Sequence, residues 1–414
     1  MKKTDINKDI QPDLKAVNAF IFAGSFSLGV IEAGFDLQKV LEISSTQPEE
    51  NAFYFKKNVE DVPVILPSEW ENDKYLDSLS NEGISLMCCN CPCSSLSQIN
   101  RNASVDGKNN VHFYRLFNVF KHVKPKVFVI ENAPTLIKLG FPILKTMANE
   151  LKDVYRFTVI RDIAGNHDVP MMRQRTLVVG WNRKCFNGIP AVEQDAHKPM
   201  LAKDVLTSEL DKTPWPSSTS DSIKDMYAYV KPGNSLMTWL AKLWASDKDG
   251  MRSIIEKRLD GTGYLREVKR IAGKILAKQN FWDKSPYRMS LDERFPSFTS
   301  VSEYIHPVED RMLSLKEMAA IMNYPSWYDF TDPEKKCKIP VAQAIAQGVP
   351  ANFGKYIAQQ ARKALEGKLE VIDASDAVMS FQHHSQHKMS LFTLDEVNSM
   401  TELALKHDAM KLER

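Results

Sequence analysis

Short apolar runs bounded by turn residues, with helical segments between them, recur along the first part of the chain. They lie at the start of 16–30 and in 39–43, 84–88, 127–130, 155–164 and 176–181. Such runs are typical of buried strands, and strands that alternate with helices form a mostly parallel sheet covered on both faces. In these sheets the chemistry lies at the carboxyl ends of the strands. The sequence therefore predicts a doubly wound α/β fold with functional residues just after the runs.

The length of 414 residues exceeds what one ordinary hydrophobic core supports, so two domains are expected. A hydrophobic fraction of 43% and a charged fraction of 26% are those of a soluble globular protein. The formal net charge of +2 excludes a histone-like polycation but leaves room for a local basic groove. No run approaches the length of a membrane span, and the polar first residues lack the apolar segment of a signal peptide. We therefore expect no membrane partner and a cytoplasmic location.

The run at 84–88 ends in a loop with the sequence Cys-Pro-Cys-Ser-Ser. Pro92 prevents further ladder pairing and favours a turn, so Cys93 lies just past the carboxyl end of a predicted strand. A thiolate there can attack an electron-poor carbon if its surroundings lower its pKa or the substrate step consumes its charge. The alternative is that Cys93 is one of several small buried cysteines without a chemical role.

Four of the six cysteines crowd together at positions 88, 89, 91 and 93. This spacing makes no sensible disulfide framework, and it favours a reducing compartment such as the cytoplasm. A structural zinc site usually takes two separated pairs of ligands, whereas Cys185 and Cys337 are single and distant in sequence. We therefore expect no metal.

Small residues at Ala23, Gly24 and Ser25 follow the first strand; they allow close approach of the backbone and precede a helix start with free N–H groups. The second strand ends at Glu42, where a carboxylate suits hydrogen bonding to the hydroxyls of a ribose. Because the glycine pattern is incomplete, a plain α/β crossover with a solvated Glu42 is the alternative.

Polar side chains also mark the later strand ends. Glu131 and Asn132 lie at the tip of the strand at 127–130, where a carboxyl group with a raised pKa can serve as an acid or hydrogen-bond donor. A merely solvated Glu131 is the alternative. Arg173 and Arg175, in the turn before the last strand, alternate on one face and point at an anion or at acids of the site.

From about 185 to 295 this strand–helix pattern gives way to scattered prolines and tryptophans, and the later part becomes basic. A basic insertion with interspersed aromatic residues is typical of proteins that follow a nucleic-acid backbone. A solvated helix face is the alternative on charge alone. Beyond it, residues 311–324 predict an amphipathic helix with a capping box of Ser314 and Glu317, and 341–365 predict a broken helical region.

Taken together, these segments resemble the DNA (cytosine-5) methyltransferase family, whose motifs occur in the family's order over residues 16–365. The Pro-Cys step of the family's catalytic loop and the serine at its end match Pro92, Cys93 and Ser97. The Glu-Asn-Val motif matches Glu131, Asn132 and Ala133, and the Val-Pro-Gln-x-Arg-x-Arg motif matches 169–175 with Met171 in place of glutamine. The later motifs match Arg311, Leu313, Ser314 and Glu317, and then Val349 and Pro350.

The resemblance implies a Rossmann-like fold that uses S-adenosyl-L-methionine, with a smaller DNA-recognition domain. It implies that Cys93 adds to ring carbon 6 of a cytosine flipped out of double-stranded DNA, while Glu131 hydrogen-bonds or protonates ring nitrogen 3. Carbon 5 then takes the methyl group. Arg173 and Arg175 would bind the carbonyl oxygen of the base, order the loop or neutralise Glu131, and Asn132 would hold the loop.

For the methyl donor, the resemblance assigns Phe20 to stack on adenine and residues 22–25, Glu42 and Pro92 to the rest of the molecule. Phe22 and Ser25 replace glycines of the family, so this end of the site departs from the pattern. The departures are consistent with a distant member, with a modified sulfonium donor or with a non-catalytic DNA-binding paralogue. The same chemistry on RNA is a further alternative.

The predicted organisation is a catalytic domain at 1–184, a target-recognition domain at 185–295, a return to the catalytic domain at 296–370, and a C-terminal linker and helix at 371–414. Within the last part, a polar linker at 382–387 precedes an amphipathic helix from about 394 to 412. The pentapeptide from Lys388 to Phe392 resembles the Gln-Leu-Ser-Leu-Phe peptide by which bacterial proteins dock in the replication sliding clamp. A strand or helix lead-in that packs on its own domain is the alternative. Neither the target sequence nor a restriction partner follows from these residues.

Overall fold

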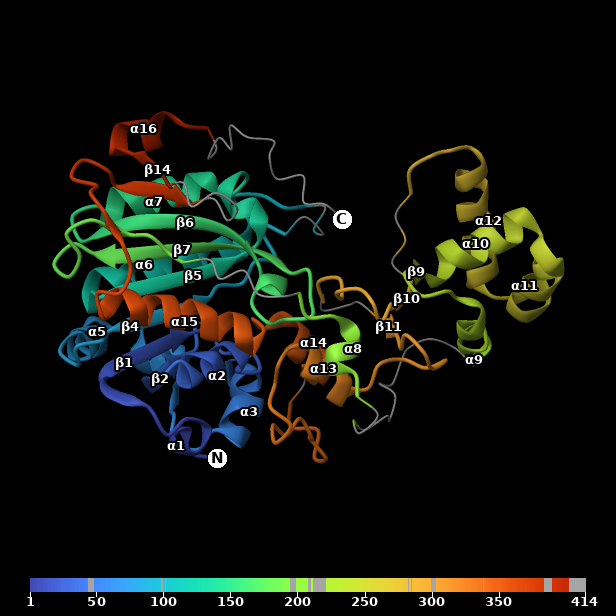
Figure 1. The fold of residues 1–414 in the computed structure, drawn as a ribbon, viewed down its shortest axis with the longest axis horizontal. Coiled ribbons are helices and arrows are strands. Elements are labelled where there is room, and N and C mark those ends of the chain that lie inside the picture. Colours follow the sequence, from blue (N-terminus) through green and yellow to red (C-terminus); the bar gives the residue numbers. More distant parts are fainter. Residues whose placement is uncertain are drawn as a thin grey trace.

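The computed structural model describes the chain except for residues 44–47, 98–99, 101, 194–198, 208–209, 211–220, 282, 284, 299–302, 338, 383–388 and 402–414. The described residues form a large lobe built on one open sheet and a small, mostly helical lobe (Figure 1). Among them, no helix has the length and apolar character needed to cross a membrane.

A nine-stranded sheet runs through the large lobe in the order β14-β13-β6-β7-β5-β4-β1-β2-β3. Its strands are β1 (Gln11–Ala19), β2 (Phe35–Leu41), β3 (Val64–Ile65), β4 (Leu86–Asn90), β5 (Val127–Asn132), β6 (Tyr155–Ile163), β7 (Gln174–Asn182), β13 (Met379–Gln382) and β14 (Met389–Phe392). β7 and β14 run antiparallel to their neighbours, and the other pairs are parallel. Every apolar run predicted as a strand lies in this sheet, which confirms the predicted doubly wound, mostly parallel α/β fold.

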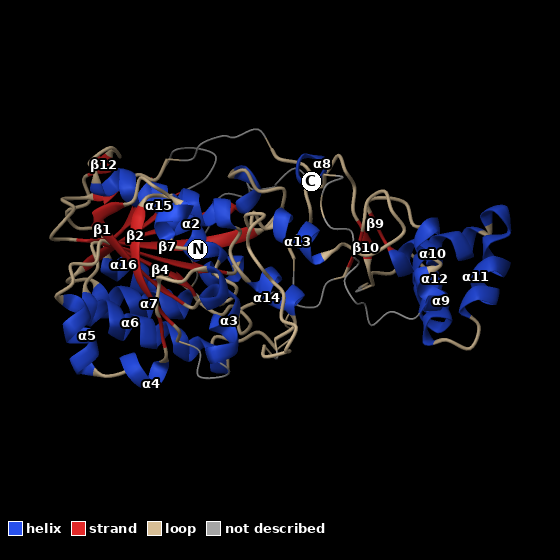
Figure 2. Cartoon of the chain, turned by 90° about the horizontal axis from the view of Figure 1, so that it is seen from below, coloured by secondary structure: helices blue, strands red, loops and turns tan. Residues whose placement is uncertain are grey.

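Alternation along the strands divides the interior of the large lobe into two hydrophobic cores, one on each face of the sheet. In β5, Val127 and Val129 belong to the first core, and Phe128 and Ile130 belong to the second. The first core is covered by α2 (Ser25–Glu32), α3 (Pro48–Asn58) and α15 (Ala351–Leu365). The second is covered by α5 (Asp73–Ser80), α6 (Val111–Val123) and α7 (Phe141–Leu151), so helices flank the strands on both sides (Figure 2).

Local sequence explains where the later helices begin and end. α13 (Leu315–Ile321) starts at the predicted capping box, in which the Glu317 amide donates to Ser314 Oγ at 3.1 Å and the Ser314 amide donates to the Glu317 carboxylate at 2.7 Å. α14 (Val341–Gln347) ends before Gly348, and α15 begins after Pro350. Both the predicted cap and the predicted break are therefore confirmed.

The small lobe has a hydrophobic core of its own. It contains α9 (Asp221–Lys224), α10 (Leu236–Ser246), α11 (Met251–Leu259) and α12 (Gly263–Leu276), beside a three-stranded sheet of β9 (Asn234–Ser235), β10 (Tyr287–Arg288) and β11 (Tyr304–Ile305). Phe186, Ile189 and Val192 instead pack in the first core of the large lobe. The core of the small lobe therefore begins later than the expected boundary at 185, and a recognition region at 185–295 remains a prediction.

The end of the described chain belongs to the large sheet. β13 runs parallel to β6, and β14 pairs with β13 as an antiparallel edge strand. Residues Met389 to Phe392 of the clamp-like peptide are thus hydrogen-bonded into their own domain, so docking in a sliding clamp is not supported; Lys388 lies outside the described residues. α16 (Leu394–Ser399) ends before Met400, whose backbone is extended, so the helix predicted from about 394 to 412 does not continue through this residue; its part from 402 on lies outside the described residues.

Candidate active site

The loop after β4 exposes one of the four clustered cysteines. Cys88, Cys89 and Cys91 are buried, and burial raises the pKa of each of these thiols well above its usual value. Cys93 is only partly buried, and its carbonyl oxygen accepts a hydrogen bond from the Leu96 amide at 2.9 Å in a turn. Within this cluster, Cys93 is therefore the thiol that a substrate can reach.

The end of β5 holds this loop in place. Asn132 Nδ2 donates to the Cys91 carbonyl oxygen at 3.0 Å, and Asn132 Oδ1 accepts from the Ala133 amide at 2.8 Å. Thr135 Oγ1 donates to the Leu96 carbonyl oxygen on the far side of the turn. Asn132 is fully buried, and its side-chain amide connects the end of β5 to the segment just after β4. Ser97, near the end of the loop, accepts from the Asn100 amide at 3.0 Å through its carbonyl oxygen.

Glu131 lies at the tip of β5 and is only 3% exposed. Arg175, near the start of β7, places Nε 2.5 Å from Glu131 Oε1. A buried carboxylate loses the stabilisation it has in water, and a guanidinium at this distance compensates for that loss. Glu131 is therefore held in a specific ion pair, and the alternative of a solvated strand-end glutamate is wrong.

Electrostatic interactions place Cys93 and Glu131 in one neighbourhood. Burial and then the charge of Arg175 lower the pKa of the Arg173 guanidinium, while Glu131 and Cys93 oppose that change. After burial, Cys93 and Glu131 are also the groups that raise the pKa of Cys91. Because Coulomb interactions weaken with distance, the thiol and the carboxyl group both lie near Arg173 and Cys91. The register agrees, since Asn90 at the end of β4 pairs with Glu131 on β5.

Arg173 and Arg175 differ in what they contact. Arg173 is 4% exposed and donates to the carbonyl oxygens of Phe298 at 3.1 Å, Ala346 at 3.0 Å and Gln347 at 3.4 Å. Arg173 therefore connects the segment at Phe298, which follows the small lobe in the chain, to the end of α14. The contacts of Arg175 match the expected neutralisation of Glu131, and those of Arg173 match the expected ordering of nearby loops.

The turn after β1 adopts a left-handed backbone at positions where the chain carries large side chains. φ is +63° at Phe20, +46° at Phe22 and +85° at Gly24, and α2 begins directly afterwards at Ser25. A left-handed conformation costs a residue other than glycine roughly 1–2 kcal/mol. The Phe20 ring is buried and contacts the edge of the His112 ring at a centroid distance of 5.4 Å.

Glu42 closes this turn from the side of β2. The Ile21 amide donates to Glu42 Oε2 at 3.2 Å, and Trp70 Nε1 donates to the Glu42 carbonyl oxygen at 3.0 Å. Glu42 is 1% exposed, so the alternative of a solvated glutamate at this position is wrong. Gly24 is required by packing, because a Cβ atom there would lie 2.4 Å from Phe55 Cδ2.

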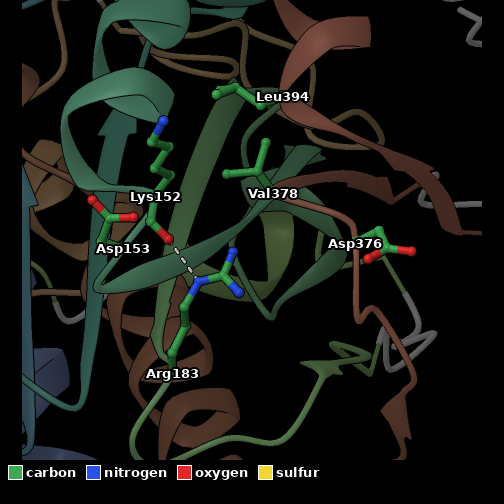
Figure 3. A pocket seen from close by; sticks show the side chains of 6 residues that line it. All are labelled: Lys152, Asp153, Arg183, Asp376, Val378 and Leu394. Carbon is green, nitrogen blue, oxygen red and sulfur yellow. Dashed lines mark hydrogen bonds between the residues drawn. The ribbon is translucent and has the colours of Figure 1, made fainter.

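A different pocket, of about 330 Å³, opens at the opposite edge of the sheet (Figure 3). Its lining residues are Lys152, Asp153, Arg183, Asp376, Val378 and Leu394. Asp153 precedes β6 and Arg183 follows β7, whereas Glu131 lies at the other end of the neighbouring β5. This pocket is therefore separate from the cysteine loop. In the described part of the chain, no group of three or more histidine, cysteine, aspartate or glutamate side chains is arranged to hold a metal ion.

Sequence patterns did not reveal a buried pair next to the site. His167 Nε2 lies 2.8 Å from Asp162 Oδ2, at the carboxyl end of β6. The only sequence signal is an aspartate that follows an apolar run and a histidine shortly after it, and such spacing is common in loops. Burial and pairing are what distinguish these two residues.

The mostly parallel sheet with helices on both faces is the Rossmann-like fold of S-adenosylmethionine-dependent methyltransferases. The chain belongs to the C-5 cytosine-specific DNA methylase family, whose model matches residues 14–363. The methyl donor of this family is S-adenosylmethionine.

Known relatives match most of the chain at low identity. The Type II methyltransferase M.XorII of Xanthomonas oryzae pv. oryzae is 23% identical over 395 residues, which cover 86% of each protein. The Type II methyltransferase M.Sau96I of Staphylococcus aureus is 25% identical over 365 residues, which cover 83% of this chain and 75% of that protein. Among solved structures, a DNA modification methyltransferase encoded within an E. coli prophage has a TM-score of 0.57 at 17% identity, over 85% of this chain and 99% of that one. The last similarity shows the fold.

Proposed function

We propose that the chain transfers a methyl group from S-adenosylmethionine to carbon 5 of a cytosine flipped out of double-stranded DNA, through a covalent bond between Cys93 and the base. The observation that carries this proposal is an accessible thiol after β4 beside the buried Glu131–Arg175 ion pair. Ring atoms of a stacked base are out of reach of protein side chains, so the base must leave the duplex.

In this mechanism the Cys93 thiolate forms a bond to ring carbon 6, and the electron pair of the carbon 5–carbon 6 double bond moves into the ring. Negative charge would otherwise collect on ring nitrogen 3 and the carbonyl oxygen. Glu131 hydrogen-bonds or donates a proton to nitrogen 3, while Arg175 holds the carboxyl group through Oε1. Carbon 5 becomes nucleophilic as a result. Once carbon 5 carries the methyl group, a base removes its proton, the double bond re-forms and the Cys93 sulfur leaves.

S-adenosylmethionine supplies an electrophilic methyl group bonded to a positively charged sulfur. We assign its site to the turn after β1, where Phe20 offers an aromatic face for adenine and Glu42 a carboxylate for the ribose hydroxyls. The backbone of residues 22–25 leads into the start of α2, and Asn18 Oδ1 is a buried acceptor with no partner among the described residues. Pro92, half-buried beside Cys93, completes the assigned set.

A related sulfonium donor is a second candidate, and Phe22 favours it. Phe22 retains the left-handed backbone but carries a partly buried ring that packs with the second core. A glycine at this position would leave that space to the donor. The ring therefore reshapes the part of the site where a backbone without a side chain would meet the donor.

We assign DNA binding to the small lobe together with the reacting edge of the sheet. Lys231 and Lys242 lie 5.6 and 5.8 Å from the centre of the Trp239 ring on α10, a combination of cations and an aromatic face that suits a nucleic-acid backbone. M.XorII and M.Sau96I are named Type II methyltransferases. We propose by analogy that this chain is the modification enzyme of a restriction–modification system.

A covalent trap tests the proposal directly. The purified chain is incubated with S-adenosylmethionine and duplex DNA that contains 5-fluorocytosine. In this base, fluorine replaces the carbon-5 proton that must be removed before the Cys93 sulfur can leave. We expect a stable protein–DNA adduct with the unaltered chain and with Cys185→Ala, an exposed cysteine far from the site, and no adduct with Cys93→Ala. An adduct with Cys93→Ala, or none with the unaltered chain, would overturn the mechanism.

Analysis of the product separates the remaining alternatives. Mass spectrometry of nucleosides from treated duplex DNA and treated transfer RNA identifies both the modified base and the added group. We expect 5-methylcytosine from DNA. A heavier substituent would identify the modified donor, and modification of RNA alone would identify the other substrate.

A further inference from the structure

The buried Asp162–His167 pair lies next to Arg175 in the sheet, because Asp162 on β6 is the cross-strand partner of Arg175 on β7. The Asp162 side chain is fully buried and that of His167 is 2% exposed, with 2.8 Å between Oδ2 and Nε2. Burying an ionisable pair this deeply costs desolvation free energy. Such a pair is therefore a candidate for a structural or functional role. The mechanism above does not use it.

The register of the sheet sets Arg175 between two carboxylates. Asp162 on β6 is the direct cross-strand partner of Arg175 on β7. On the other side of β7, Glu131 of β5 pairs with Leu177, two residues further along the same face as Arg175. Asp162 and Glu131 therefore lie on strands to either side of Arg175, whose Nε forms an ion pair with Glu131.

Both carboxylate oxygens of Asp162 have hydrogen-bond partners other than Arg175. Oδ1 accepts from the Ile163 amide at 2.7 Å, and Oδ2 accepts from His167 Nε2 at 2.8 Å. The His167 ring is itself stacked on Tyr356 of α15, with centroids 3.6 Å apart and planes 18° apart, and on Phe353 at 5.4 Å. The imidazole therefore has one fixed orientation, which points its nitrogen at Asp162.

We propose that His167 is a positioning residue that holds Asp162 and thereby reserves Arg175 for Glu131. Without the histidine donor, Oδ2 of Asp162 loses a hydrogen bond that holds its negative charge away from the cross-strand guanidinium. Arg175 then pairs with Asp162, and Glu131 loses the contact that orients it toward the base. This inference rests on the proposed function, because it describes how the proposed reacting carboxyl group is kept in place.

The positioning role is tested by asking whether Asp162→Asn restores the activity that His167→Phe removes. His167→Phe keeps an aromatic ring to stack on Tyr356 but removes the donor to Asp162. We expect it to lower kcat for methyl transfer about a hundredfold, as for a misplaced reacting group, with the KM for DNA little changed. Adding Asp162→Asn removes the competing charge, so the double variant should recover to within about tenfold of the unaltered chain.

His167→Gln provides the conservative rescue, because its amide can still donate to Asp162. We expect it to retain more activity than His167→Phe. His122→Phe is the matched control, since His122 is also a histidine near an aspartate (3.6 Å from Asp73) but lies on the surface of α6. If His167→Phe does not fold, His167→Leu takes its place with the same expected suppression by Asp162→Asn.

The outcomes separate the inference from the function it rests on. A double variant no more active than His167→Phe, with both folded by circular dichroism, would overturn the positioning role while the methyl transfer of the unaltered chain stands. Lack of methyl transfer by the unaltered chain would overturn the proposed function, and the positioning role with it. Recovery of activity in the double variant supports the proposal, since a purely structural role for His167 predicts additive losses.

Discussion

The proposed reacting end of the site keeps key residues of the family motifs, whereas the proposed donor end departs from them. At the reacting end, Cys93, Glu131 and Arg175 are the residue types that the family motifs contain. At the donor end, Phe22 takes the place of a glycine, yet its backbone is left-handed at φ +46°. Chemistry requires particular functional groups, whereas a binding turn requires a particular backbone path. The comparison teaches that a chain can change its side chains where the main chain makes the contacts.

Replacing the two arginines separately gives the largest expected effect on the reacting end. Arg175→Lys offers Glu131 a shorter, differently shaped cation, and we expect kcat to fall about a hundredfold. Arg173→Lys leaves buried carbonyl oxygens without donors, and we expect its main effect to be a loss of about 3 kcal/mol in the free energy of unfolding. Methyl-transfer kinetics and urea unfolding of both variants measure the two effects. If the loss in kcat relative to the loss in unfolding free energy were the same in the two variants, the distinction between the two arginines would be contradicted.

Residue 22 sharpens the comparison at the donor end. Phe22→Gly and Phe22→Ala both remove the ring, but only alanine keeps the Cβ atom that disfavours a left-handed backbone. We therefore expect the glycine variant to be the more stable of the two by about 1 kcal/mol in urea unfolding. Equal stabilities would mean that the backbone at this position is not left-handed in solution. Calorimetric titration with S-adenosylmethionine would then show whether removing the ring also improves donor binding, as the donor-site assignment predicts.

The smallest expected effect is a pH dependence that comes from His112, which contacts Phe20 at the donor end. Burial, and then the charge of Arg115, lower the pKa of His112 below the usual value of about 6.5 for histidine, against the opposing influence of Glu71. The unfolded chain therefore binds this proton at a higher pH than the folded chain does. Stability is accordingly full above pH 6.5 and falls as the pH drops below it.

His112→Asn should remove this part of the pH dependence. Free energies of unfolding at about pH 8 and about pH 5 should differ less in the variant than in the unaltered chain. A similar substitution at His122, which lies nearer the surface of the same helix, serves as the control and should leave the dependence in place. An unchanged difference in His112→Asn would assign the effect to other groups.

Much of the large lobe could be predicted from sequence, because its strands and caps depend on nearby residues. The run at 127–130 became β5, and the capping box at Ser314 started α13 as expected. β13 was missed, because its strand character depends on pairing with β6 rather than on a local pattern, and β14 was foreseen only as a strand or helix lead-in that packs on its own domain. The linker predicted at 382–387 begins inside β13 for the same reason.

The residues of the candidate site also divide into those that could be predicted from sequence and those that could not. Cys93 and Glu131 could be named because each follows a recognisable strand and matches a motif. The difference between Arg173 and Arg175 could not be seen, since the carbonyl partners of Arg173 lie 125 to 174 residues away in sequence. The Asp162–His167 pair was missed because its meaning comes from burial and from the cross-strand position of Arg175.

The three carbonyl groups bound by Arg173 have a mechanical consequence. A guanidinium is flat and rigid, so Phe298, Ala346 and Gln347 cannot slide past one another while they share it. The chain passes Phe298 on its way back from the small lobe, and Arg173 is only two residues from Arg175. A tilt of that lobe as it loads onto a duplex would therefore pull on the same short stretch of backbone that carries the partner of Glu131.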